Sequence, residues 1–77
     1  MKLREFRPGE SGRVSGFRPG SKLYRRKLLA MGMTPGAEFT VTRLAPLGDP
    51  IELRLRGFAL TLRKADAEAI EVERTER

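Results

Sequence analysis

The sequence contains no cysteine, no histidine and no tryptophan. Without cysteine it can form neither a disulfide nor a thiolate metal site. Without histidine it lacks imidazole metal ligands and the general base of the common catalytic triads. Carboxylates are the remaining anionic ligands, and oxygen-only sites favour hard cations over tightly bound zinc or iron. We therefore expect no cofactor and no enzymatic activity.

Long apolar runs are absent as well. No stretch approaches the about 18 apolar residues of a membrane span, and the first ten residues, MKLREFRPGE, have no apolar signal-peptide core. These features predict a cytoplasmic chain. Its 77 residues are enough for a single domain, 1–77, with a thin core.

Positive charge is abundant and unevenly distributed. The net charge is +6, and residues 1–30 carry nine Lys or Arg against two Glu. Residues 65–77 reverse the balance, with five acidic and two basic side chains. Such asymmetry favours an oriented encounter with a charged partner, although a basic surface that only confers solubility is the alternative.

Three Pro-Gly pairs predict turns at 8–9, 19–20 and 35–36, because Pro and Gly suit the two central positions of a type II turn. Between them we expect a strand over 12–17 and a helix from the N-cap Ser21 to Gly32. Gly32 would end the helix in a left-handed conformation. Alternating apolar residues predict a further strand over 37–44.

The clearest pattern is the pair IELRLR and FALTLR, residues 51–56 and 58–63. Apolar residues alternate in both runs, and a turn at Arg56-Gly57 would place Leu55 opposite Phe58 with both apolar sets on one face. Residues 64–69 are expected to form at most one helical turn. A last strand would span 69–73, with Ile70 and Val72 inward and 74–77 frayed. The predicted fold is mainly β: a small, closed or partly closed barrel of about five strands with one α-helix after the first strand.

The run YRRKLLAMGMTPGAEFTVTRLAPLGDPIEL, residues 24–53, resembles the FeoA family, the small cytosolic component of bacterial ferrous iron uptake. The segment GFALTLRKADAEAIEV resembles the closing hairpin and strand of that family, so the resemblance covers residues 12–73. It implies an SH3-like barrel and a non-enzymatic regulatory role. It also implies a partner, the membrane permease FeoB with its cytosolic GTPase domain, which would hold the chain peripheral to the inner membrane.

Helical spacing places Tyr24, Leu28 and Met31 on one stripe, which we interpret as core. Leu29 lies off this stripe and is either a second core edge or an exposed contact. Met33 follows the helix, where a flexible side chain suits either a contact surface or a gap beneath the turn. We take Leu29 and Met33 as a surface pair.

Three further features extend the predicted docking surface. Leu47 lies in the stiff loop PLGDP, where an apolar side chain is exposed unless it meets a partner. Asp49 is expected to close this loop through the loop's own backbone. The cluster that includes Arg25 and Arg26 is either a solvated face or a contact for an acidic GTPase surface. The predicted partner-binding residues are thus Arg25, Arg26, Leu29, Met33, Leu47 and Asp49.

Four carboxylates near the C-terminus are weak candidates for a divalent cation, although their spacing matches no metal motif: Asp66, Glu68, Glu71 and Glu73. A free sheet edge would allow a weak homodimer. The alternative function is nucleic-acid binding, suggested by a pI near 10.8. We disfavour specific nucleic-acid binding because stacking needs exposed aromatic rings, and Phe39, Phe58 and Tyr24 are predicted to point inward.

Overall fold

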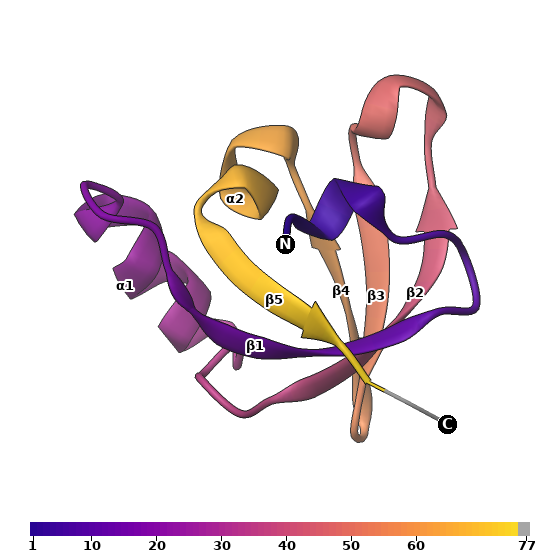
Figure 1. Ribbon diagram of the computed structural model, residues 1–77, viewed down its shortest axis with the longest axis horizontal. Helices are drawn as coiled ribbons and strands as arrows, with labels where there is room; N and C mark the ends of the chain where they lie inside the picture. Colours follow the sequence, from indigo (N-terminus) through magenta and orange to yellow (C-terminus); the bar gives the residue numbers. More distant parts are fainter. Residues whose placement is uncertain (76–77) are drawn as a thin grey trace.

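The computed structural model describes residues 1–75, and it is mainly β (Figure 1). Its elements, in order, are η1 (Leu3–Glu5), β1 (Ser11–Phe17), α1 (Lys22–Ala30), β2 (Glu38–Leu44), η2 (Pro46–Gly48), β3 (Ile51–Leu55), β4 (Phe58–Leu62), α2 (Lys64–Glu68) and β5 (Ile70–Arg74). The strands form one antiparallel sheet in the order β4-β3-β2-β1-β5. The predicted five-stranded fold with a helix inserted after the first strand is confirmed, and the short α2 is a second helix.

The β3–β4 hairpin has the predicted register. Leu55 pairs with Phe58, and the two other apolar pairs follow: Leu53 with Leu60 and Ile51 with Leu62. The prediction that Phe58 points inward is wrong, because its side chain is 42% exposed. Phe58 begins β4 next to the turn, at the rim of the core, where its ring packs against Gly32 instead.

The N-terminal segment completes the core, a role that the sequence patterns do not indicate. Leu3 and Phe6 are almost fully buried, and the Phe6 ring lies 5.4 Å from that of Phe39. Phe6 covers Gly12 of β1 so closely that a Cβ atom at Gly12 would lie 2.7 Å from the ring. The sheet therefore needs both a glycine on β1 and an aromatic ring from outside the strands to close its core.

The C-terminal end is more ordered than expected. Arg74 belongs to β5, its guanidinium lies 5.1 Å from the centre of the Phe6 ring, and it donates a hydrogen bond to Glu10 at 3.2 Å. The prediction of a frayed 74–77 is thus wrong at Arg74, because packing on Phe6 extends the strand. Residues 76 and 77 lie outside the described part of the chain.

The start of α1 also differs from the expectation. The helix begins at Lys22, but the Ser21 side chain makes no cap hydrogen bond to it. The Ser21 hydroxyl donates instead to the Arg18 carbonyl at 2.5 Å, within the preceding Pro-Gly turn. Ser21 directly precedes the helix, as predicted, but the prediction that its side chain caps the helix is wrong.

Replacing Gly12 with alanine should lower the free energy of unfolding by about 1–3 kcal/mol, because the added methyl group overlaps Phe6 and the Glu73 carbonyl. Gly16→Ala is the matched control on the same strand, since its Cβ atom would have no neighbour within 4 Å. Urea denaturation followed by circular dichroism measures both. Equal stability of the two variants would contradict the close approach of Phe6 to β1.

Candidate docking surface

The C-terminus of α1 is a tight corner closed by two backbone hydrogen bonds. The Met33 amide donates to the Leu28 carbonyl at 2.9 Å, and the Gly32 amide donates to Leu29 at 3.1 Å. Gly32 has a φ of 98°, the left-handed conformation that glycine adopts at little cost. This pattern is a Schellman motif, in which the residue after the glycine folds back onto the last helical turn. The predicted left-handed cap is confirmed.

The same motif decides which apolar side chains of the corner are exposed. Met33 folds back toward Leu28, and both side chains are fully buried. The prediction of Met33 as a surface residue is therefore wrong. Leu29 is 37% exposed, which agrees with its position off the apolar stripe. Within that stripe Leu28 is core and Met31 packs partly against it, but Tyr24 is exposed, so its assignment to the core is wrong.

The η2 loop, residues 45–50, presents the most exposed apolar side chain of this region. Leu47 is 96% exposed, and its φ is 69°, a left-handed value that costs a residue with a side chain roughly 1–2 kcal/mol. The loop is nevertheless tied at its base, because the Ala45 amide donates to the Pro50 carbonyl at 3.1 Å. Leu47 is thus held outward by a fixed backbone.

Asp49 secures this loop in a different way from the one predicted. Its Oδ1 accepts a hydrogen bond from the Lys64 amide at 3.1 Å, at the start of α2, and lies 4.0 Å from the Arg63 guanidinium. The expected turn within the loop's own backbone is therefore not the contact that forms. The carboxylate joins the η2 loop to α2, which makes Asp49 a support for Leu47.

The corner of α1 and the η2 loop lie at opposite ends of the molecule (Figure 1). The η2 loop precedes Ile51 at the start of β3, whereas Gly32 touches Phe58, which pairs with Leu55 at the far end of that strand. Five strand residues separate those ends by about 13 Å. The predicted residues therefore form two separate surfaces and not one.

The basic cluster belongs to the α1 end. The Arg25 guanidinium stacks over the Phe17 ring at 5.8 Å, and Arg26 points to solvent. Lys27 turns the other way, and its ammonium lies 3.3 Å from the Asp66 carboxylate on α2. Arg25 and Arg26 are consequently distant from Leu47.

The four candidate metal ligands are engaged by cations of the chain itself. Asp66 is buried, accepts a hydrogen bond from the Arg63 amide and pairs with Lys27. The other three pair with basic groups: Glu68 with Lys2, Arg4 and Arg18, Glu71 with Arg18 and the N-terminal amine, and Glu73 with Arg13. Within residues 1–75 no group of acidic side chains has the arrangement to hold a metal ion.

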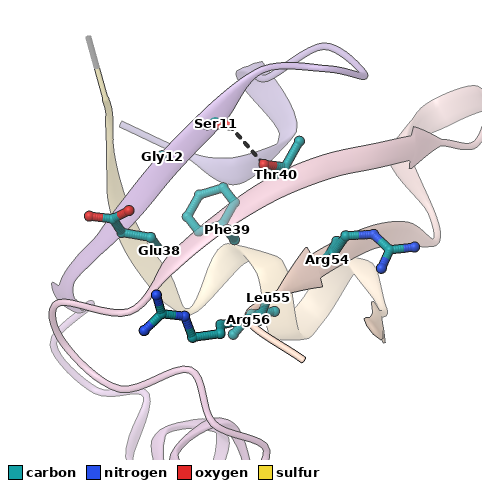
Figure 2. Close-up of a pocket in the computed structure, with 8 residues that line it drawn as sticks. All are labelled: Ser11, Gly12, Glu38, Phe39, Thr40, Arg54, Leu55 and Arg56. Carbon is teal, nitrogen blue, oxygen red and sulfur yellow. Dashed lines mark hydrogen bonds between the residues drawn. The ribbon is translucent and has the colours of Figure 1, made fainter. Parts of the chain in front are cut away.

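A shallow hollow of about 270 Å³ lies across β1, β2 and β3 (Figure 2). Ser11 and Thr40 share a hydrogen bond of 2.8 Å on its wall. The guanidinium groups of Arg54 on β3 and Arg56 in the turn after it point in different directions, so they do not converge on one bound group. The hollow therefore offers no defined set of ligand-binding groups.

Comparison with known proteins identifies the relatives of this fold. The FeoA domain family matches residues 1–74. The chain belongs to the FeoA family. It is 36% identical over 73 residues to a fusion of Fe(2+) transport protein A and the Fe(2+) transporter FeoB from Porphyromonas gingivalis. The match covers 95% of this chain but 8% of the fusion, so the chain corresponds to a small part of that protein.

Two solved structures share this fold. An FeoA-like protein from Clostridium acetobutylicum is 43% identical with a TM-score of 0.86, covering 100% of this chain and 88% of that one. Stenotrophomonas maltophilia FeoA, described as a prokaryotic SH3 domain protein and solved with zinc, is 22% identical. Its TM-score of 0.78 over 95% of this chain and 89% of its own confirms the SH3-like fold. The FeoA family is linked to ferrous iron transport.

In the described part of the chain, 1–75, none of the helices has the length and apolar character required to cross a bilayer. The fusion relative joins an FeoA segment to a transporter.

The ion pairs of Glu68 predict how stability depends on pH. The hydrogen bond from the Lys2 ammonium at 2.8 Å, with Arg4 and Arg18 nearby, lowers the pKa of Glu68 below its ordinary value of 4.5. A carboxyl with a lowered pKa stabilises the fold above its unfolded pKa, and this contribution is lost as the pH falls through the folded value. Stability should therefore fall as the pH drops below about 4.5.

Urea denaturation at a series of pH values tests this dependence. Glu68→Gln removes the titrating group and should make the acid-side decrease less steep. Lys2→Gln removes the donor and should have the same effect, because the carboxyl then titrates closer to its unfolded value. Slopes identical to that of the wild type in both variants would show that these contacts do not contribute.

Proposed function

We propose that this chain is a non-enzymatic, cytosolic accessory protein of ferrous iron uptake. It acts by docking on the cytosolic GTPase domain of a FeoB-type permease, and the η2 loop makes the contact. The single observation that carries the proposal is Leu47, which is almost fully exposed on a backbone held in an unfavourable conformation.

Leu47 is held ready for contact with a partner. Strained backbone persists where the surrounding structure imposes it, and such positions concentrate at functional sites. The hydrogen bonds of Ala45 and Asp49 fix the loop before binding, so little conformational entropy remains to be lost when a partner covers the leucine. One apolar side chain projecting from a rigid loop fits an apolar pocket on a protein surface.

The identity of the partner is supported by the relatives. The fusion protein of Porphyromonas gingivalis carries the two components in one chain, which keeps them at a high effective concentration. A separate chain must obtain the same association by affinity. Docking that favours one conformation or nucleotide state of the permease would shift its activity by the difference in affinity for the two states.

A binding measurement with a FeoB-type permease in detergent at about 150 mM salt tests the proposal, since exposed charges are largely screened under that condition. Leu47→Glu should weaken binding by about thirtyfold or more, as expected for a hot-spot residue. Leu23→Glu is the matched control. Leu23 is an 80% exposed leucine on α1, so this substitution introduces the same charge at a different surface.

Three outcomes are distinguishable. Loss of binding in Leu47→Glu with retention in Leu23→Glu supports docking through the η2 loop. Equal retention in both variants contradicts that surface. Absence of binding by the wild-type chain contradicts the direct contact with the permease.

A further inference from the structure

The outer face of α1 combines positive charge with exposed apolar side chains. Eight of its nine residues are partly or largely accessible, and Leu28 alone is buried. At about 100° per residue, one continuous side of the helix displays six residues, in order around the axis: Arg25, Leu29, Lys22, Arg26, Ala30 and Leu23. The face therefore has three cations, two leucines and no acidic residue.

The charges of this face are not neutralised within the fold. Among residues 1–75, no carboxylate pairs with Lys22, Arg25 or Arg26. Lys27, whose ammonium does pair with Asp66, lies on the side of the helix that faces α2. The helix thus keeps its paired lysine toward the protein and its unpaired cations toward solvent.

The second property of this face is an exposed apolar side chain, that of Leu23. It is 80% exposed and lies among basic residues, and Figure 1 shows α1 at the periphery of the molecule, outside the sheet. Most of the surface of this leucine is therefore in contact with solvent. Unpaired Lys and Arg on one helical face are attracted to an anionic membrane surface, and exposed leucines among them add apolar area that such a contact buries.

We propose that the outer face of α1 binds directly to an anionic phospholipid surface. The three cations contact lipid phosphates, and Leu23 and Leu29 enter the boundary between headgroups and acyl chains. The anionic lipids complement a helix that carries only positive charge. This inference is independent of the proposed docking on the permease, and lipid vesicles without permease test it alone.

The chain supplies its own probe for the experiment. Tyr24 is the single tyrosine, the sequence has no tryptophan, and Tyr24 lies on α1 with an exposed ring. Its fluorescence therefore reports on α1 only. Vesicles of phosphatidylcholine with about one-third phosphatidylglycerol should co-sediment with the full chain and change the fluorescence of Tyr24. Vesicles of phosphatidylcholine alone should do neither.

Matched variants distinguish binding through the outer face of α1 from general attraction between a basic protein and an anionic surface. The triple variant K22Q/R25Q/R26Q should bind anionic vesicles about tenfold or more weakly. The triple variant R43Q/R54Q/R56Q removes the same three charges from β2, β3 and the turn that follows, and it should stay within about threefold of the wild type. Leu23→Ser should weaken binding by about fivefold without changing the charge, whereas Leu47→Ser should not.

Three results would contradict lipid binding by the outer face of α1. Equal weakening by the two triple variants would overturn the proposal in favour of diffuse charge attraction. Failure of the wild-type chain to bind anionic vesicles would overturn it directly. Tighter binding to duplex DNA than to vesicles at the same salt, abolished by K22Q/R25Q/R26Q, would make the face a nucleic-acid surface. Circular dichroism of each variant confirms that these exposed substitutions leave the fold intact.

Discussion

The left-handed turn at Gly32 is the constraint on which the arrangement of the molecule depends. It reverses the chain at the end of α1 and brings Met33 back onto Leu28, so the helix is anchored at its C-terminal end. A glycine is required there because a side chain would be strained at this φ and would also meet the Phe58 ring at 2.9 Å. Since the anchor uses one buried helical residue, the opposite face of α1 is left free for other contacts.

The two ends of β3 then have different roles. The η2 loop precedes the strand with Leu47 held outward, and the α1 corner packs beside its far end through Gly32 and Phe58. A chain that touched lipid with α1 would turn the η2 loop away from the membrane, toward a cytosolic domain of its partner. One small barrel would in this way connect a lipid surface with a protein surface, and neither contact would compete with the other.

Much of the fold follows from the sequence because alternation and turn chemistry are local. The register of Leu55 with Phe58 and the cap at Gly32 could both be predicted from spacing alone. The errors arise where a contact between distant segments decides burial. Met33 is buried by the Schellman reversal, and Phe6 is buried because Gly12 leaves room for its ring. The exposure of Leu47 was predictable from its loop, but its separation from Leu29 required the fold.

The expectation is that opposite ends of the molecule bind different partners. Amide NMR spectra of the isotopically labelled chain test it most directly, with anionic vesicles and detergent-solubilised permease added in separate titrations. Vesicles should perturb the signals of residues 22–30 most strongly, and permease those of residues 45–50, with little overlap. If the same residues were the most strongly perturbed in both titrations, the two partners would share one surface, contrary to this expectation.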